Sequence, residues 1–405
     1  MTDQASLKLA LNRDDPSLNV GAFVQVLTET TNSYKYLFLL APLNRASRHA
    51  MNEEPIKIPL TDLAIDMLTL AWYPSRYFKL SFGAQDQIPL LLHEIGKHVS
   101  TRKHGKEVLK HIRLEIQKNI DIDKTTKTIL RYVQFRLLRP FFRAEFNGVA
   151  DNAVNRSILE LTRKAENSPN PALYALHGQG TLPSALTLHL HPHWHALILR
   201  WHQVIRSWVL HEWAKYLQAR NPAMPNVLGK LLPPDRRNLV QFKQVRRFWD
   251  EFFELQGITC PYTNEKLRRA SFVLDHFLPW SYVGHDLPWN LIPVTPAANS
   301  SKGAKLPDER HIKALATRQH IALTFAHKNL TQKRWQVLTE SYRQDLRLDD
   351  PNLLNQKPLI DAYQQALMPQ INLGKQSGFE GGWTKSYCNN RIRVVSWKMN
   401  RALQS

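Results

Sequence analysis

Residues 260–307 concentrate side chains that could together hydrolyse a phosphodiester bond. A β-rich run, residues 271–274, ends in an Asp-His pair, and polar residues follow it at intervals. The candidates for this chemistry, in chain order, are Asp275, His276, Asn290, Asn299 and Lys302. A histidine titrates near neutral pH and can take a proton from water, while carboxylate and amide oxygens hold a hard divalent cation that stabilises the leaving oxygen. Neighbouring side chains of a strand point to opposite faces, so Asp275 and His276 could reach metal and water separately.

In this order the five residues resemble the HNH family of nucleases, which have the ββα-metal fold. There, a strand ends in Asp-His, an Asn opens the second strand, and a His or Asn on the next helix precedes a Lys by three residues. The resemblance implies that His276 is the general base and that Asn290 braces the loop and orients the His276 ring. It implies that Asp275 and Asn299 bind one divalent ion, Mg²⁺ or Mn²⁺, and that Lys302 contacts phosphate. A buried Asp-His hydrogen bond with Asn299 as a helix cap would explain each residue singly, but not the ordered set.

The motif also has basic neighbours and an altered cysteine pattern. We expect Arg268 and Arg269, before the first strand, and Lys305, after the helix, to contact the nucleic-acid backbone. Many HNH nucleases hold a structural zinc ion with two Cys-x-x-Cys knuckles, but this chain has only Cys260 and Cys388. Four thiolate ligands cannot come from one such chain, so we expect packing to hold the domain instead.

The composition favours a polyanionic partner. The formal net charge is +20, and the hydrophobic and charged fractions are those of a soluble globular protein. We expect DNA as the partner, with binding that weakens as salt rises, and no membrane contact because no apolar run is long enough to span one. Two cysteines, and a start without a signal-peptide pattern, predict a cytoplasmic protein. No nucleotide-binding or other cofactor motif is found, so no small-molecule cofactor is expected.

The pattern of apolar residues predicts a mainly α protein with an embedded ββα-metal module. We expect a helical, basic N-terminal region over residues 1–220 and a Pro-rich connector over 221–235. The nuclease module with its leading helix should span 236–310, and a helical C-terminal region 311–405. Within the first region, we expect one helix over residues 20–44, in which residues 31–35 interrupt the apolar face and could introduce a kink, and a loop or hairpin over 165–185.

Three segments of the N-terminal region carry signals of their own. Residues 31–35 and 77–83 resemble stretches found beside the nuclease in a group of bacterial HNH-containing proteins. Residues 97–143 are dense in Lys and Arg, either as solvated helix faces or as a groove that follows a DNA backbone. His191 and His195 would share one face of a helix and could bind a transition metal, although Pro192 favours a helix start with core contacts.

These observations predict a metal-dependent DNA endonuclease that nicks as a monomer. The likeness implies one of two roles. The protein would be a bacterial phage-defence effector, such as the nuclease of a Zorya-type system acting with other subunits, or a restriction enzyme. The alternatives are a catalytically silent protein that binds DNA through a degenerate HNH module, and a nuclease that cleaves RNA.

Overall fold

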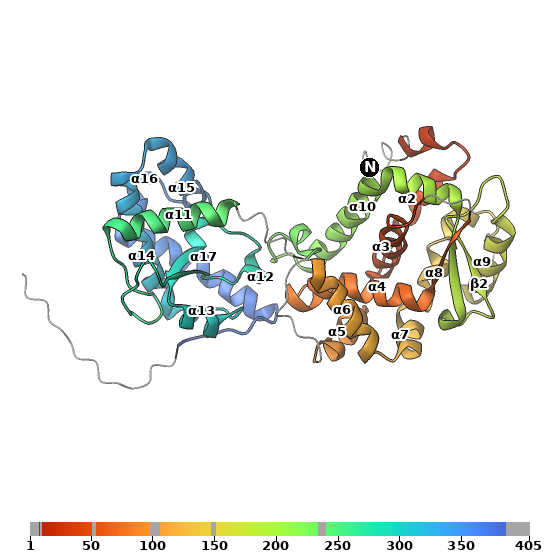
Figure 1. Ribbon diagram of the computed structural model, residues 1–405, viewed down its shortest axis with the longest axis horizontal. Helices are drawn as coiled ribbons and strands as arrows, with labels where there is room; N and C mark the ends of the chain where they lie inside the picture. Colours follow the sequence, from red (N-terminus) through yellow and green to blue (C-terminus); the bar gives the residue numbers. More distant parts are fainter. Residues whose placement is uncertain are drawn as a thin grey trace, which may run out of the picture. The chain divides into compact units, whose positions relative to one another are not determined.

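The computed structural model describes residues 8, 10–50, 54–97, 106–146, 151–233 and 240–385. The chain divides into two compact units. Unit 1 comprises Met1–Asn238 together with Ser281–Gly284, and unit 2 comprises Leu239–Trp280 together with His285–Ser405. Helices dominate both units (Figure 1), which confirms the predicted mainly α class. Within the described ranges, no helix combines the length and apolar character needed to cross a membrane.

Unit 1 consists of helices and a small antiparallel sheet. Its helices are α2 (Val20–Gln25), α3 (Tyr34–Ala46), α4 (Leu60–Trp72), α5 (Ile88–Gly96), α6 (Lys106–Asn119), α7 (Ile122–Ile129), α8 (Val133–Arg136), α9 (Asp151–Ala165) and α10 (Pro192–Arg220). Its strands are β1 (Ile56–Pro59), β2 (Tyr174–Gly178) and β3 (Leu186–Leu190).

The core of unit 1 is built around α3, which packs against α4 and α10. Nine of the thirteen residues of α3 are buried, and eight of them form the unbroken apolar run from Tyr36 to Leu43, as expected of a helix buried around most of its circumference. The segment just before it is fixed by buried polar contacts from distant parts of the chain. The Ser33 amide donates to Asp86 Oδ2 at 2.8 Å, and Trp213 Nε1 donates to Ser33 Oγ at 3.1 Å. Asp86 also accepts from the Ile88 amide at 3.0 Å, so this carboxylate joins the start of α3 to the start of α5.

The sheet has the strand order β1-β3-β2, with both pairings antiparallel. Leu188 pairs with Ile58 on one side and with Leu176 on the other, and all three side chains are buried on one face. Helix α9 packs on β2, as the ribbon shows at the yellow-green end of unit 1 (Figure 1). The alternation of Leu186, Leu188 and Leu190 with polar residues is the period-two pattern of a half-buried strand.

Unit 2 consists of a two-stranded sheet and surrounding helices. Its strands are β4 (Val273–His276) and β5 (Leu291–Val294). Its helices are α11 (Val240–Leu255), α13 (Pro296–Lys302), α14 (Arg310–Asn329), α15 (Gln332–Leu346), α16 (Asp350–Leu353) and α17 (Gln356–Gln376), while α12 (Trp280–Val283) has its first residue in unit 2 and the rest in unit 1.

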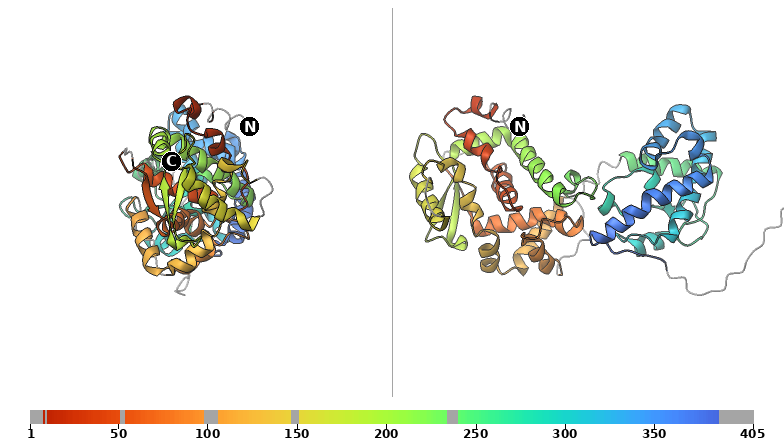
Figure 2. Two further views of the ribbon diagram at one scale, coloured as in Figure 1. Left: turned by 90° about the vertical axis from the view of Figure 1, so that its right-hand side faces the viewer. Right: turned by 180° about the vertical axis from the view of Figure 1, so that it is seen from behind.

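Aromatic and helix–helix packing hold unit 2 together. The Phe252 ring of α11 meets the Phe325 ring of α14 edge-on at 5.1 Å between centroids, and Phe253 stacks on Phe272 at 4.7 Å. Helices α14 and α17 pack along each other, as the right-hand view of Figure 2 shows for the blue helix α17. The carboxyl end of the described chain returns to the module, because the Trp383 amide donates to the Leu306 carbonyl at 3.0 Å.

Two expectations for unit 1 need revision. The predicted single helix over residues 20–44 is two helices, α2 and α3, because the buried bonds of Ser33 fix a break before Tyr34. The segment over 165–185 takes the hairpin alternative: β2 lies within it and β3 follows at once. In the predicted connector, residues 228–230 form a short 3-10 turn. The last two residues of the connector, 234 and 235, lie outside the described residues.

Candidate active site

Strand β4 carries Asp275 and His276, and β5 holds β4 in place. The two strands pair antiparallel, with Asp275 opposite Ile292 and His276 opposite Leu291. The Asp275 side chain is 4% exposed, whereas that of His276 is 19% exposed. The alternation of a strand therefore turns the carboxylate into the interior and leaves the imidazole accessible.

Asp275 is held by one neutral and one cationic donor. The Tyr262 hydroxyl donates to Asp275 Oδ2 at 2.7 Å, and Lys302 Nζ donates to Oδ1 at 3.1 Å. The pKa of Tyr262 is well above its usual range because burial, and then the Asp275 charge, disfavour a phenolate. Burial lowers the pKa of Lys302, and the Asp275 carboxylate opposes that shift. The carboxylate thus has a positive charge beside it inside the protein.

Lys302 is buried, so its side chain cannot make the phosphate contact that the resemblance implied. Its side chain is fully buried, and its ammonium also donates to the His276 carbonyl at 2.6 Å. The reason is the position on α13: the helix packs against β4, and Lys302 is in the last turn, on the side that meets Asp275. In this arrangement Lys302 is the counter-ion of Asp275 and a support for β4.

His276 forms a pair with Asp286, a residue from the loop between the two strands. His276 Nε2 and Asp286 Oδ1 are 2.6 Å apart, and the Asp286 side chain is 12% exposed. The Phe242 ring of α11 stacks on the imidazole, with centroids 6.1 Å apart. This leaves His276 Nδ1 as the ring nitrogen that can meet a water molecule.

Asn290 braces the loop from within, as the resemblance implied, and does so through backbone groups. Its side-chain Nδ2 donates to the Leu278 carbonyl at 3.0 Å, and its side-chain Oδ1 accepts from the Leu278 backbone amide at 2.8 Å. The Asn290 carbonyl accepts from the Phe277 amide at 2.8 Å, and the side chain is fully buried. These contacts lie one or two residues beyond His276, so they position the strand end, and no described bond of Asn290 reaches the His276 ring.

Asn299 lies on α13, one turn before Lys302. Thr295 caps this helix, accepting from the Ala298 amide at 3.3 Å, and Pro296 begins it. The Asn299 side chain is partly exposed and makes no hydrogen bond to any other residue that the structure describes. Its amide oxygen is therefore open to a ligand on the face of α13 that carries Lys302.

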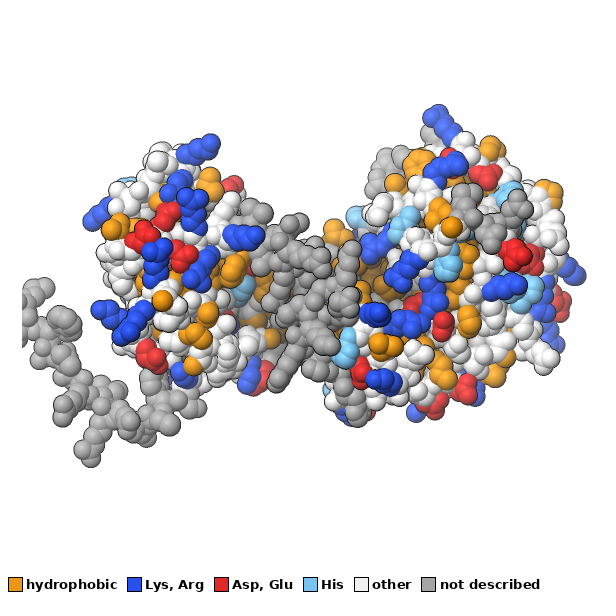
Figure 3. Space-filling model, viewed as in Figure 1, with side chains coloured by type: hydrophobic (Ala, Val, Ile, Leu, Met, Phe, Trp, Pro, Cys, Tyr) orange, Lys and Arg blue, Asp and Glu red, His pale blue; other side chains and the backbone are white. Residues whose placement is uncertain are grey.

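The other three side chains expected to contact nucleic acid differ in whether they already form an ion pair within the protein. Arg268 is exposed, with no ion pair to a described residue. Arg269 pairs with Glu254 at 2.9 Å, and Lys305 pairs with Glu380 at 2.8 Å. Of the three, Arg268 is the side chain most directly available to a phosphate. Lys and Arg side chains are spread over the visible faces of both units (Figure 3).

The segment before β4 keeps the shape of a knuckle. Cys260 is buried, its amide donates to the Glu265 carbonyl at 2.9 Å, and Thr259 and Lys266 form an isolated bridge. Arg318 of α14 donates to Thr259 Oγ1 and to Asn264 Oδ1, both at 2.8 Å. Hydrogen bonds from α14 fasten this turn and present Tyr262 to Asp275.

Comparison with known proteins agrees with this geometry. Residues 260–308 match the family model of HNH endonucleases. This match supports an HNH endonuclease segment within the chain. No curated protein and no solved structure matches the chain. The HNH match covers the segment before β4, both strands and α13, and does not extend to residues 1–259 or to the helices from α14 onward.

HNH nucleases use divalent metal ions, and two residues here have fitting donors. Asp275 offers carboxylate oxygens and Asn299 an amide oxygen, the ligand types that Mg²⁺ and Mn²⁺ prefer. Both carboxylate oxygens of Asp275 already accept a hydrogen bond, Oδ1 from Lys302 and Oδ2 from Tyr262, so a metal ion would have to use their remaining lone pairs beside the lysine charge.

The histidines of unit 1 form a different cluster from the one considered in the sequence. His195 is buried, with Nε2 3.2 Å from the Ala46 carbonyl, and His191 caps α10 by accepting from the His193 amide. Helix start and core contacts are therefore confirmed for them. Instead, Glu166, His177 and His189 bring their ligand atoms within 4.8 Å of one another. The sequence search missed Glu166 because α9 and the hairpin approach each other only in the fold.

Replacing Lys302 with Met should destabilise the protein by about 3–5 kcal/mol, since it leaves the buried Asp275 charge without its partner. Chemical denaturation measures this loss. The double variant Lys302→Met with Asp275→Asn should recover part of it, and Lys313→Met, an exposed lysine of α14, should cost little. Equal stability of Lys302→Met and wild type would contradict the role given to this pair.

Proposed function

We propose that this protein is a DNA endonuclease whose HNH segment hydrolyses phosphodiester bonds with the help of a divalent metal ion. The observation that carries the proposal is the His276–Asp286 pair beside the buried Asp275, inside the segment that matches HNH endonucleases. A base that can reach water and a carboxylate that can hold a metal ion are the two groups that the reaction requires. Asp275 and His276 lie on β4 and Asn299 lies on α13, which packs against β4, while β5 pairs with β4.

Each residue has a separate task in this proposal. His276 Nδ1 accepts the proton of the attacking water, and Asp286 holds the imidazole in place through Nε2 and stabilises its positive form. Asp275 and Asn299 would hold the metal ion, which when bound stabilises charge on the leaving 3′ oxygen. Tyr262 and Lys302 fix the rotamer of Asp275, and Asn290 fixes the strand end. The products carry 5′-phosphate and 3′-hydroxyl ends.

One HNH segment has one base, so a monomer cuts one strand and leaves a nick. A biological role in phage defence or restriction, with Zorya-type nucleases as the model, follows from the sequence likeness alone. A silent DNA-binding protein is the second candidate, but the hydrogen-bonded His276 and the unblocked Asn299 favour catalysis over it. RNA cleavage requires the same groups, and substrate competition separates it from DNA cleavage.

Wild-type protein should convert supercoiled plasmid to the nicked circle with Mg²⁺ or Mn²⁺, and EDTA should stop the reaction. Asn299→Ala should slow nicking by about 100-fold, because it removes an oxygen ligand of the ion. Gel analysis of the plasmid measures both effects. Ser300→Ala, at an exposed neighbouring position on α13, is the matched control and should cut normally. Cutting that continues in EDTA would defeat the proposed metal dependence.

Asp286→Asn should lower kcat by about 10- to 100-fold and leave KM nearly unchanged, because the imidazolium formed after proton transfer loses its carboxylate partner. Steady-state nicking of a labelled duplex separates the two constants. Asp361→Asn, an exposed site on α17, serves as the control. A variant with normal kcat would show that Asp286 has no role in positioning the base.

A further inference from the structure

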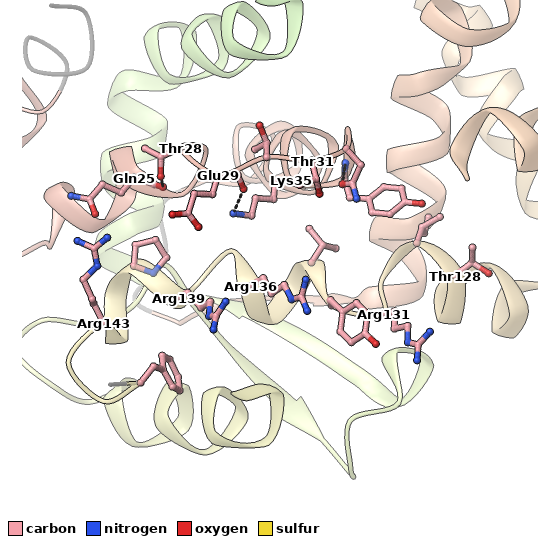
Figure 4. A pocket seen from close by; sticks show the side chains of 18 residues that line it. Gln25, Thr28, Glu29, Thr31, Lys35, Thr128, Arg131, Arg136, Arg139 and Arg143 are labelled. Carbon is pink, nitrogen blue, oxygen red and sulfur yellow. Dashed lines mark hydrogen bonds between the residues drawn. The ribbon is translucent and has the colours of Figure 1, made fainter. Parts of the chain in front are cut away.

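Unit 1 contains a hollow of about 900 Å³ that the nuclease chemistry does not use. One wall is the segment from the end of α2 to the start of α3, and the other runs from α7 through α8 to Phe146 (Figure 4). Its size lies within the range of about 300–1,000 Å³ typical of small-molecule sites. The hollow therefore has the dimensions of a ligand pocket.

The charged side chains of this pocket are almost all positive. Its lining contains one carboxylate, Glu29, and the cations Lys35, Arg131, Arg136, Arg139 and Arg143. Figure 4 shows the four arginines in a row along one wall, with Glu29 and Lys35 on the other. Five positive charges and one negative charge leave a net of four positive charges in the pocket.

Two half-buried arginines elsewhere in unit 1 are paired with acids, unlike the exposed arginines of the pocket. Arg45 and Arg113 share Asp62 and Asp66 between α3, α4 and α6.

In the pocket, Arg131, Arg136 and Arg143 have no ion pair to any residue that the structure describes, and all three are exposed. Like charges held together without acids repel one another, which stability alone does not favour. An anionic ligand would remove this repulsion.

The other wall is held rigidly before any ligand arrives. Ser33 is buried with its bonds to Asp86 and Trp213, and the Tyr34 hydroxyl accepts from the Gln87 amide at 3.0 Å. Lys35 Nζ donates to the Glu29 carbonyl at 2.8 Å. Burial lowers the pKa of Lys35; the Glu29 charge opposes this shift, and Arg136 and Arg139 add to it. Burial and the neighbouring arginines disfavour the positive charge of Lys35, and a bound anion would stabilise that charge.

Aromatic and polar groups complete the lining. The Tyr132 ring contacts two guanidinium groups, with Arg131 5.0 Å and Arg136 4.5 Å from its centroid, which restrains both side chains. Hydroxyl and amide groups suited to a sugar or a base line the rest: Gln25, Thr28, Thr30, Thr31 and Asn32. The pocket thus combines phosphate-binding cations with hydrogen-bonding groups of a kind that a nucleoside requires.

We propose that this pocket of unit 1 binds a nucleoside polyphosphate, with the arginine row on the phosphate chain and the Thr-rich wall toward the nucleoside. A terminal phosphate carries about two negative charges at neutral pH, so a phosphate chain matches the concentrated charge of the pocket. A duplex spreads its charge at about one per 1.7 Å of axis and suits a long surface better than a hollow of this size. This site is separate from the HNH residues and does not depend on the proposed cleavage.

The test is isothermal titration of the full-length protein in EDTA, which removes metal-dependent cutting from the measurement. The probes are ATP, GTP, inorganic tripolyphosphate and a short oligothymidylate. We expect one nucleotide per chain, with tripolyphosphate binding more weakly because it lacks the nucleoside. Arg131→Gln and Arg143→Gln should each weaken binding by about tenfold, the value of a lost charge-assisted hydrogen bond.

Both arginines are exposed, so these variants should keep the wild-type fold, which circular dichroism checks. Arg156→Gln, an exposed arginine of α9 outside the pocket, is the matched control and should bind as wild type does. Three results would each overturn the proposal: no binding of any polyphosphate, equal binding by the pocket variants and wild type, or binding of oligothymidylate alone. The last result would identify the pocket as a site for a nucleic-acid strand.

Discussion

The ion pair between Asp275 and Lys302 is the contact on which the HNH segment depends. Two charges taken out of water are costly unless they meet each other and further hydrogen bonds, and both conditions hold here. Tyr262 comes from the knuckle, Asp275 from β4 and Lys302 from α13, so one buried cluster ties together the three parts of the motif. The same cluster fixes the orientation of the carboxylate that the chemistry requires.

The sequence predicted the parts of this site that depend on local pattern. A β-rich run ending in Asp-His gives β4, and alternation alone separates the buried Asp275 from the accessible His276. It did not predict the position of Lys302, since a lysine is usually exposed and only the packing of α13 on β4 buries it. The pairing of Asp286 with His276 was missed for a similar reason. A loop has no regular side-chain spacing, so its sequence does not indicate which residue an Asp286 side chain will contact.

Unit 1 shows the same division between local and tertiary information. The apolar pattern predicted helix over the span of α2 and α3, and Pro192 predicted the start of α10, but the break before Tyr34 results from Asp86, a residue 53 positions away from Ser33. Glu166 joins His177 and His189 only because α9 lies against the hairpin. The density of Lys and Arg over residues 97–143 was visible in the sequence. Their division into acid-paired cations, such as Arg113, and pocket cations, such as Arg136, required the fold.

Single-turnover nicking of supercoiled plasmid by His276→Ala tests the central claim most directly. The account predicts a rate at least about 100-fold below wild type, because a positioned general base contributes at least that much. His285→Ala, which removes the neighbouring histidine of the loop, should cut at close to the wild-type rate. Cutting by His276→Ala at the wild-type rate, with the protein folded and free of other nucleases, would contradict the assignment of this HNH site.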